Sequence, residues 1–482
     1  MADNNLFQDF ESVSSKQWKQ QIQYELKGAD YNETLVWESP EGIKVKPFYH
    51  NDESELKYQI NTPKNAFFIV QNIFVHDTKM SNQRALDCLQ RGAESIRFTI
   101  ESEAIVIEDL MQKLPLENVT YYFHLPFLST DYISKINDFA TKNQANSIIQ
   151  IDPIGQLCKD GNWFENLDKD FEKLNTIAQN SPPLEGCPKG GVVAPKGGAT
   201  PNDEATPKRK SPSFLNINAQ IYQNAGANMV QQLAYTLAHI NEYFNRIPTI
   251  NQPITIEISV GTNYFFEIAK LRAMRLLFNT LAAEYNHNFD CHIIVTPTKR
   301  NKTIYDYNVN MLRTTTECMS AILGNANAIA NLPYDNLYHK DNEFGDRIAR
   351  NQLLVLKQES YFDKVNNPAD GAYYIENLTE QLAEKALLLF KEIEEKGGFI
   401  TQLIEGTIQK KIQESAQKEQ NLFDSGKEVL LGTNKYPNKN DRMKHDLELY
   451  PFVKQNPRKT LITPIIEKRL AEKLEQERLS QE

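Results

Sequence analysis

Cysteine, net positive charge and long hydrophobic runs are all scarce in this sequence. The cysteines are odd in number and far apart, a pattern that suits reduced thiols in a cytoplasm and not a disulfide framework or a zinc site. The formal net charge is −10, and acidity spread along the chain argues against general binding to nucleic acid or anionic membranes. We expect structural or incidental roles for all five cysteines, Cys88, Cys158, Cys187, Cys291 and Cys318.

Signals for export and for membrane insertion are also missing. The first residues, MADNNLFQDFESVSS, have neither the cationic start nor the apolar core of a signal peptide. No apolar run approaches the ~18 residues that a membrane-spanning helix needs. These absences predict a cytoplasmic protein that has no membrane partner and no nucleic-acid partner.

What the sequence does contain is an alternation of short β-rich runs and helical stretches. The 482 residues, 40% of them hydrophobic, are enough for two average domains or for one large barrel with additions. The alternation predicts an α/β fold with a parallel sheet and helical crossovers, open or closed. We expect strands at 95–100, 119–125, 147–151, 214–219, 254–260, 292–296 and 326–330, and helices at 81–92, 103–114, 132–143, 227–244, 265–285 and 307–323.

The stretch 344–398 carries the most detailed local pattern. A helix is expected over 346–358, and the Asn-, Pro- and Gly-containing run that follows it is typical of a turn. We then expect a short strand at 372–375. A second helix comes next, with Asn377 as its N-cap and Glu380 three residues later, as in a capping box.

Several runs spread along the chain match one known family in the family's own order. They include DRIARN at 346–351, RTTTECMSA at 313–321, FFEIAKLRAMRLLF at 265–278 and SPEGIKVKPFY at 39–49. With them the chain resembles the methylmalonyl-CoA mutase family over 6–478, apart from one insert. The resemblance implies a closed (β/α)8 barrel of the TIM type. It also implies adenosylcobalamin chemistry, a radical rearrangement that links methylmalonyl-CoA and succinyl-CoA.

The resemblance divides the chain into three parts. Residues 1–50 are expected to form an N-terminal arm with a linker, 51–440 the barrel, and 441–482 a C-terminal helical tail. Within the barrel, 181–213 is crowded with Pro and Gly and lacks apolar periodicity, so we expect a disordered surface loop. Within the tail, a charged helix is expected over 463–478, with Thr463 as N-cap and Pro464 at its first position.

The N-terminal arm has an amphipathic pattern over 6–28. Trp18, Ile22 and Leu26 recur at intervals of four residues, so they share one helical face. Such an arm can pack on its own barrel or reach across a partner. The resemblance favours the partner, because mutase chains pair through extended N-terminal segments.

The cobalamin-binding motif of the family, D-x-H-x-x-G, has no match. The nearest run is Asp290-Cys291-His292, which has Val295 in place of the glycine and lies on an expected barrel strand. We therefore expect no flavodoxin-like cobalamin domain in this chain, and neither cofactor-binding nor metal-binding residues. Adenosylcobalamin is expected on a partner, the large subunit of a heterodimer.

The substrate pocket of the family is altered as well. Catalytic relatives carry YHMQEAGA, whose histidine donates a hydrogen bond to the thioester carbonyl. The matching run here is QIYQNAGA at 220–227, which puts Ile221 at the histidine position. Isoleucine cannot donate, so stabilisation of that carbonyl is lost. Where catalytic chains read QTSGWSL, this chain reads IVTPTKR at 294–300. We therefore predict no catalytic residue.

A few polar residues of the matching motifs stay open to two interpretations. Four residues of the DRIARN motif are either CoA-phosphate ligands or, as we favour, ion-pairing and packing residues on a helix surface. Glu317 is expected to be a hydrogen-bond acceptor of the scaffold, since a radical isomerisation needs no general base. His239 is expected to be a satisfied surface or core histidine. The four residues are Asp346, Arg347, Arg350 and Asn351.

The leading interpretation is the small, non-catalytic subunit of a heterodimeric methylmalonyl-CoA mutase. One alternative is a catalytic acyl-CoA mutase barrel of the isobutyryl-CoA mutase kind, whose cobalamin domain lies on a separate chain. Another is a CoA-binding regulatory protein without a mutase partner. Loss of the pocket motifs favours the first interpretation over the catalytic barrel.

Overall fold

Eight parallel strands form a closed barrel in the computed structural model, which describes residues 11–53, 58–63, 66–180, 213–454 and 457–482. The order around the ring is β10-β3-β4-β5-β6-β7-β8-β9. This arrangement confirms the expected TIM-type barrel. The strands are β3 (Phe68–Phe74), β4 (Ser95–Thr99), β5 (Thr120–His124), β6 (Asn146–Ile151), β7 (Ser213–Asn218), β8 (Thr255–Val260), β9 (His292–Pro297) and β10 (Ala328–Ile329).

The barrel is closed by its shortest strand. Ala328 of β10 is aligned with Phe68 of β3 on one side and with Ile294 of β9 on the other. The backbone N–H of Phe68 also donates to the carbonyl oxygen of Asn327 at 2.9 Å. Because β10 has a neighbour on both sides, the ring leaves no free strand edge.

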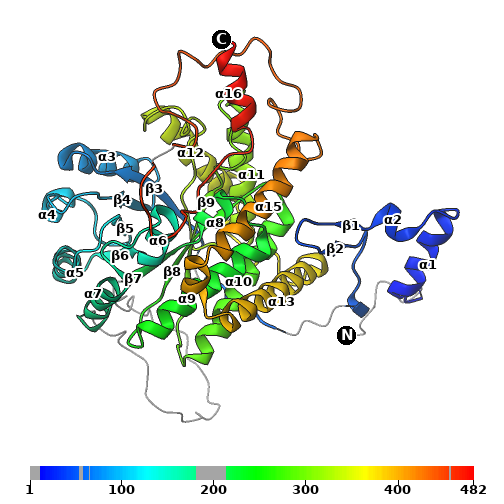
Figure 1. Ribbon diagram of the computed structural model, residues 1–482, viewed down its shortest axis with the longest axis horizontal. Coiled ribbons are helices and arrows are strands. Elements are labelled where there is room, and N and C mark those ends of the chain that lie inside the picture. The colour runs from blue at the N-terminus through cyan, green and yellow to red at the C-terminus, as the bar shows by residue number, and fades with distance from the viewer. Residues whose placement is uncertain (1–10, 54–57, 64–65, 181–212, 455–456) are drawn as a thin grey trace, which may run out of the picture.

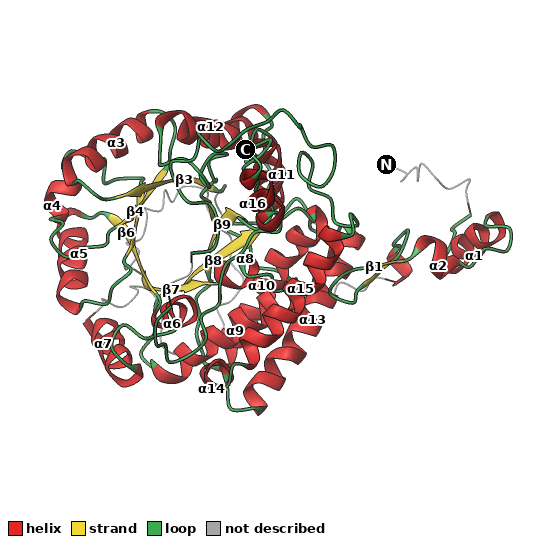
Figure 2. Cartoon of the chain, turned by 45° about the horizontal axis from the view of Figure 1, so that its top comes forward, coloured by secondary structure: helices red, strands yellow, loops and turns green. Residues whose placement is uncertain are grey.

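Helices surround the strands as an outer ring (Figure 2). They bury the outward-facing strand residues, such as Ile96, Phe98 and Ile256, in one hydrophobic core. In place of the helix expected at 103–114, the structure has a single helical turn, α4 (Ile107–Leu110). The ring comprises α3 (Thr78–Gln90), α4 (Ile107–Leu110), α5 (Thr130–Asn143), α6 (Pro153–Asp160), α7 (Leu167–Asn180), α8 (Gln220–Asn224), α9 (Met229–Arg246), α10 (Tyr264–Glu284), α11 (Val309–Leu323) and α12 (Glu343–Leu354), the last continued by one π-helical turn, Val355–Glu359.

A second helical layer, α13 (Tyr373–Glu395), covers α9 and α10 (Figure 1). The strand expected at 372–375 is therefore wrong. Aromatic and β-branched residues favour a strand locally, but tertiary contacts override that preference. Arg272 of α10 forms an ion pair with Glu376, which holds the first turn of α13 in place. Asn377 is not the N-cap, and its Oδ1 instead accepts from Gln381 Nε2 at 2.7 Å.

The described part of the N-terminal arm extends away from the barrel (Figures 1 and 2). It consists of α1 (Ser15–Glu25), α2 (Tyr31–Leu35) and a hairpin of β1 (Trp37–Glu38) with β2 (Lys44–Val45). Ser14 and Gln17 form a capping box at the start of α1. At the base of the arm, the Trp37 ring meets Phe266 of α10 edge-on at 5.8 Å.

The C-terminal part continues as α14 (Phe399–Ile404), which packs on α9, then as α15 (Thr407–Asp424) and α16 (Glu472–Ser480). The helix expected over 463–478 begins nine residues later than predicted. Residues 463–469 form no helix, and backbone groups of this segment bond to loops of the barrel instead. Leu470 N donates to Arg300 O at 2.9 Å and Lys468 N to Asn224 O at 3.0 Å. Thr463 is therefore not a helix cap.

Some expectations fall partly or wholly outside the described residues. The insert at 181–213 does so except for Ser213, which begins β7 and belongs to the barrel. Cys187 lies in the same gap, whereas Cys88, Cys158, Cys291 and Cys318 are buried free thiols. Within the described ranges, the strands form only the barrel and the β1–β2 hairpin. No helix in those ranges is long and apolar enough to cross a membrane.

Candidate functional site at the carboxyl end of the barrel

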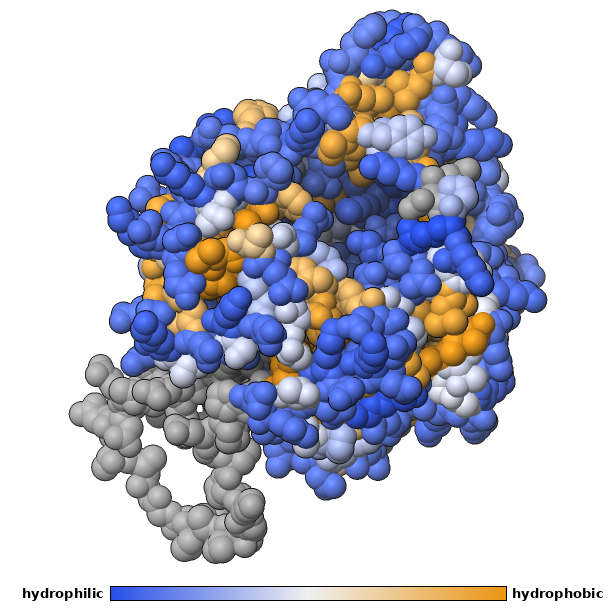
Figure 3. All heavy atoms as spheres, turned by 60° about the vertical axis from the view of Figure 1, so that its left-hand side comes forward, coloured by the Kyte–Doolittle hydropathy of each residue, from blue (hydrophilic) through white to orange (hydrophobic). Residues whose placement is uncertain are grey.

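The carboxyl ends of the strands are where barrel enzymes place their functional residues. Here several inward-facing side chains near the strand ends are polar and partly exposed: Asn72 of β3, Thr99 of β4, His124 of β5 and Asn218 of β7. The last residue of β3, Phe74, is an exposed aromatic. In Figure 3 this face of the molecule is hollowed beside the protruding C-terminal part, and hydrophilic residues predominate around the hollow. The mouth of the barrel is therefore the first place to look for a substrate site.

An ion pair crosses the barrel directly beneath this mouth. Arg97 lies on β4 and Glu257 on β8, which are four strands apart in a ring of eight and so stand on opposite sides. Nη2 of Arg97 is 2.8 Å from both carboxylate oxygens of Glu257. The Glu257 side chain is only 2% exposed. Side chains from two opposite walls therefore meet in the interior and close it.

Three amides complete the coordination of the Glu257 carboxylate. Gln150 Nε2 donates to its Oε1 at 3.0 Å, and Asn216 Nδ2 donates to the same oxygen at 2.8 Å. Gln220 Nε2 of α8 donates to Oε2 at 3.0 Å. A buried carboxylate is tolerated when it is paired and fully hydrogen-bonded. We call Arg97, Gln150, Asn216, Gln220 and Glu257 the lumen network.

The rest of the barrel interior contains an apolar cluster, a tyrosine–histidine pair and small polar side chains such as Thr120 and Thr255. Val70, Tyr122 and Ile294 are among the buried residues of this inner cluster. The Tyr122 hydroxyl lies 2.9 Å from Nε2 of His292. His292 is thus on a barrel strand, as predicted, and contacts a neighbour inside the barrel.

His124 lies at the mouth next to the lumen network. Burial lowers the pKa of its imidazole to about 3, and the positive charges of Arg97 and Lys159 act in the same direction. Its Nδ1 is buried without a hydrogen-bond partner among the described residues. His124 is therefore neutral at physiological pH.

Ile221, predicted to occupy the position of the substrate-binding histidine, lies on α8 just outside the barrel. Its side chain is 1% exposed and belongs to the main hydrophobic core. The preceding residue, Gln220, is the one whose side chain reaches the lumen network. The geometry therefore leaves position 221 without any hydrogen-bond donor.

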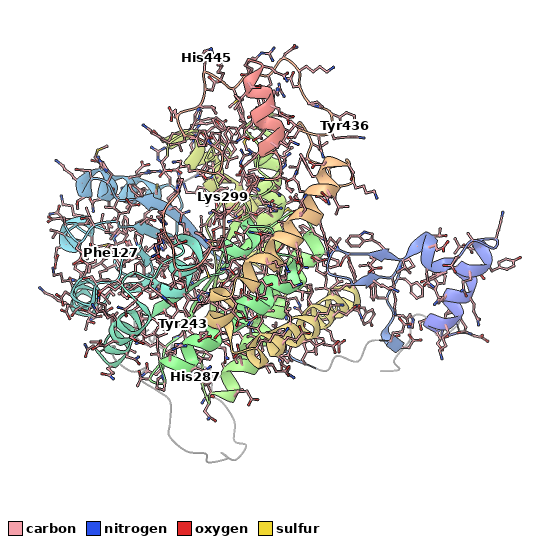
Figure 4. All side chains as sticks on the ribbon, in the orientation of Figure 1. Phe127, Tyr243, His287, Lys299, Tyr436 and His445 are labelled. Atoms are coloured by element: carbon pink, nitrogen blue, oxygen red, sulfur yellow. The ribbon has the colours of Figure 1, made fainter. Side chains whose placement is uncertain are left out.

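A second buried network joins β6 to α8 and α9. Asp152 Oδ1 lies 2.9 Å from His239 Nε2 and accepts from the Tyr243 hydroxyl at 2.7 Å (Tyr243 is labelled in Figure 4). His239 Nδ1 lies 2.9 Å from the Tyr222 hydroxyl. Burial alone would raise the pKa of Asp152, but the attraction of His239 and several hydrogen bonds bring it below its ordinary value. His239 is fully buried, so it is a satisfied core histidine, one of the two roles expected for it.

The DRIARN motif lies on α12, where its charged groups bind the protein itself. Asp346 forms an ion pair with Arg84 of α3. Arg350 Nη1 donates to Gln71 Oε1 at 2.8 Å, and the Arg347 guanidinium lies 5.5 Å from the centre of the Phe344 ring. Asn351 is exposed on the helix. These contacts fit ion pairing and packing, the interpretation favoured from the sequence.

Two further motifs place charged pairs in the scaffold. Glu317 of RTTTECMSA accepts from Lys302 Nζ at 2.8 and 3.0 Å, and burial raises the pKa of this carboxyl. Lys270 of FFEIAKLRAMRLLF forms an ion pair with Glu267 and donates to Ser259 O at 2.8 Å. Glu317 is thus an acceptor of the scaffold, as expected. Among the described residues, no three metal-ligating side chains gather at one point.

Sequence reasoning missed the lumen network altogether. Arg97 and Glu257 are the charged residues of the strands SIRFT and TIEISV, and each lies between two apolar residues. A charged residue flanked by buried apolar neighbours is the signal that could have indicated them. Their pairing could not be read from the sequence, because it depends on which strands stand opposite each other in the closed ring.

Comparison with known proteins points to one family. The methylmalonyl-CoA mutase family matches residues 205–478. The chain is 31% identical over 469 residues to the methylmalonyl-CoA mutase small subunit of Porphyromonas gingivalis, a match that covers 90% of this chain and 71% of that protein. It is 26% identical over 487 residues to the methylmalonyl-CoA mutase of Rhizobium meliloti, covering 89% of this chain and 64% of that one. Its match to the Cereibacter sphaeroides enzyme, 35% identical over 242 residues, covers 47% of this chain and 34% of the enzyme.

Proposed function

The chain belongs to the methylmalonyl-CoA mutase family, and we propose that it is the small, non-catalytic subunit of a heterodimeric mutase. In this proposal the large subunit binds adenosylcobalamin and interconverts methylmalonyl-CoA and succinyl-CoA in the cytoplasm. The present chain stabilises that subunit through contact between two related barrels. The barrel assigned to this role covers 51–440, between the arm at 1–50 and the tail at 441–482.

The lumen network is the observation that carries this proposal. Glu257 accepts hydrogen bonds from four side chains in a site that is almost inaccessible to solvent. A substrate entering along the barrel axis would have to separate Arg97 from Glu257. Breaking such a buried pair leaves an uncompensated charge and costs about 3–5 kcal/mol. The interior is therefore poorly suited to hold an acyl group.

The surroundings of Ile221 support the same proposal. A catalytic acyl-CoA mutase benefits from a hydrogen-bond donor at the thioester carbonyl, where negative charge develops. Ile221 is packed in the hydrophobic core and offers none. The polar neighbour that does point inward, Gln220, already donates to Glu257.

Two histidines of the barrel, His292 and His239, are already held by neighbouring side chains, which does not suit a lower cobalt ligand. His292 contacts Tyr122 inside the barrel, and His239 contacts Asp152 and Tyr222 in the core. Adenosylcobalamin supplies the radical chemistry of such mutases. We therefore assign the cofactor to the partner and derive no step of the reaction on this chain.

The N-terminal arm is the part proposed to contact the partner. Trp18 of α1 is 50% exposed, although its ring meets Phe48 edge-on at 6.4 Å. Ile22 and Leu26, on the same helical face, are half-buried. An interface inherited from a symmetric dimer of related barrels would bury such a face. Each anchor residue would contribute about 1–3 kcal/mol.

One experiment tests the catalytic part of the proposal. The purified chain is passed through gel filtration after incubation with adenosylcobalamin and is assayed with methylmalonyl-CoA. We expect no cobalamin absorbance in the protein peak and no turnover above background. Turnover by the chain with a separate cobalamin-binding protein would favour the isobutyryl-CoA mutase alternative. Tight CoA binding without any mutase partner would favour the regulatory alternative.

A second experiment tests the arm. Analytical ultracentrifugation compares complex formation with the large subunit for the full chain, for a variant lacking 1–28 and for Trp18→Ala. Both changes should weaken the complex and leave the barrel folded. Tyr24→Ala is the matched control, since Tyr24 lies on the opposite face of α1 and is 81% exposed. Unchanged affinity after deletion of the arm would exclude it as an anchor.

A further inference from the structure

A cavity of about 710 Å³ lies outside the barrel, between α15 and the C-terminal segment. Its lining includes Ala225, which directly follows α8, and Arg300, from the loop after β9. Figure 4 labels Lys299, the neighbour of Arg300, beside this place. Small-molecule sites in proteins commonly have volumes of about 300–1,000 Å³. We call this cavity the α15 groove; it is separate from the barrel interior.

The α15 groove is held in shape by bonds between its walls and its floor. Nη1 of Arg300 donates to the carbonyl oxygen of Lys468 at 2.7 Å, and Arg300 also forms an ion pair with Glu419 of α15. Gln420 of α15 donates to Leu470 O at 3.2 Å. The arginine thus ties both walls to the loop after β9. A groove whose walls are fixed in this way loses little entropy when a ligand binds.

Gly226 sets how closely α15 approaches the barrel. Its φ is +98°, and a Cβ at this position would lie 2.5 Å from Cβ of Ala416 and 2.9 Å from Cζ of Arg300. Any other residue would push α15 outward or displace the arginine. The shape of the groove therefore depends on this glycine.

The charge of the α15 groove is positive, in a chain whose net charge is −10. Lys468 and Lys473 line it; both are exposed, and neither side chain bonds to any described residue. The acidic residue of the lining, Glu472, is occupied by the backbone N–H groups of Arg469 at 2.9 Å and Val453 at 3.2 Å. Two unpaired ammonium groups in a concave site attract a small anion.

The remaining lining combines amides with an aliphatic surface. The side-chain amides of Gln413 of α15 and Gln476 of α16 have no hydrogen bond to a described residue, and each offers both donors and an acceptor. Ile412, Ala416 and Ile465 supply apolar area between them. An amide can pair with the donor and acceptor on one edge of a nucleobase, and an aliphatic surface can cover the face of its ring.

We propose that the α15 groove binds a nucleoside phosphate, with Lys468 and Lys473 at the phosphates and Gln413 at the base. Lysine binds phosphate as a point charge, and glutamine suits adenine. The proposal concerns a site outside the barrel, so it holds whether or not the chain is catalytic.

Isothermal titration of the full-length chain tests the proposal, with ATP, AMP, adenosine and inorganic phosphate as probes. We expect saturable binding of ATP that is tighter than that of AMP, and weaker binding of phosphate or adenosine alone. The double variant Lys468→Ala, Lys473→Ala should weaken ATP binding by at least about tenfold, the loss of about 1.4 kcal/mol. Gln413→Leu should weaken ATP binding and leave that of inorganic phosphate unchanged.

The matched control is the double variant Lys410→Ala, Lys418→Ala. It removes the same charge from exposed positions on α15 that do not line the groove, and it should leave ATP binding unchanged. Gln413→Glu, which adds negative charge and removes no lysine, should also weaken ATP binding. Melting curves confirm that each variant is folded. No saturable binding up to about 1 mM, an equal loss in the control, or phosphate binding as tight as ATP would each overturn the proposal.

Discussion

Arg97 and Glu257 face each other across the full diameter of the barrel, with Nη2 of the arginine 2.8 Å from both oxygens of the carboxylate. No helix or loop separates them, so the pair links β4 to β8 directly through the interior. The stability of the closed ring should therefore depend on both partners, although neither takes part in the hydrophobic core.

We predict that Arg97→Ala and Glu257→Ala each lower the free energy of unfolding by about 3–5 kcal/mol, because each leaves the other charge buried and unpaired. The double variant Arg97→Met, Glu257→Leu should lose less than the sum of the two single losses, since it leaves no unpaired charge and only the three amide donors without an acceptor. Urea denaturation measures all three. Lys46→Ala, in the exposed pair with Glu53, is the control and should change little. Single-variant losses below about 1 kcal/mol would mean that the pair is hydrated.

We predict that His124 makes the protein less stable as the pH falls. Its pKa is about 3 when folded and about 6.5 when unfolded. The unfolded state therefore binds a proton first, so stability is full above pH 6.5 and decreases as the pH falls towards 3. Denaturation at pH 7, 6, 5 and 4 should show a smaller loss of stability in His124→Gln than in the wild type, the remainder coming from other groups with lowered pKa values, such as His287 and Asp152. His445→Gln, at an exposed position, should behave as the wild type does. If the free energy of unfolding falls equally with pH in the wild type and in His124→Gln, the lowered pKa of His124 does not control this stability.

We predict that Ile221→His does not create a mutase. The side chain would enter the hydrophobic core without a partner, at a cost of about 1–3 kcal/mol for the buried polar group. The variant should melt earlier and turn over methylmalonyl-CoA only at background rate. Ile221→Val, which keeps the site apolar, should cost about 0.5–1.5 kcal/mol and serves as the matched control. Turnover by Ile221→His would contradict the proposed non-catalytic role.

We predict that Gly226→Ala destabilises the chain more than Gly371→Ala does. Both glycines have positive φ, +98° and +76°, and positive φ costs an alanine about 1–2 kcal/mol at either site. A Cβ at position 371 meets nothing within 4 Å, whereas one at position 226 lies 2.5 Å from Ala416. The difference between the two melting temperatures therefore isolates the contact with α15. Equal losses would mean that α15 can move away freely.

The barrel itself could be predicted from the sequence because its signals are local. Short β-rich runs at 95–100, 119–125 and 254–260 match β4, β5 and β8 closely. α15 was missed because its sequence, TIQKKIQESAQKEQNLFD, is mostly polar and has few apolar residues to mark a buried face. Its position depends instead on Gly226 and Arg300, which are more than a hundred residues earlier in the chain.

The errors at 372–375 and 463–478 have a common physical cause. The local sequence favours a strand at 372–375 and a helix over 463–478, but contacts with residues distant in the sequence determine the conformation of both segments. Arg272 binds Glu376 at the start of α13, and the loop at Arg300 takes the N–H of Leu470 away from a helix. The lumen network was missed for the same reason. Arg97 and Glu257 can be identified as charged strand residues in the sequence, but they form an ion pair only because the closed barrel brings β4 and β8 to opposite sides of one interior.

Closure by β10 also has a consequence for the order of events during synthesis. Ala328 pairs with Phe68, which leaves the ribosome about 260 residues earlier, or roughly 13–50 s earlier at typical translation rates. For that interval β3 has a partner on one side only, and its other edge is open to any extended chain nearby. The two residues of β10 cover this open edge of β3. The nascent barrel is therefore protected from pairing with other chains only after β10, the last strand to be synthesised, has emerged.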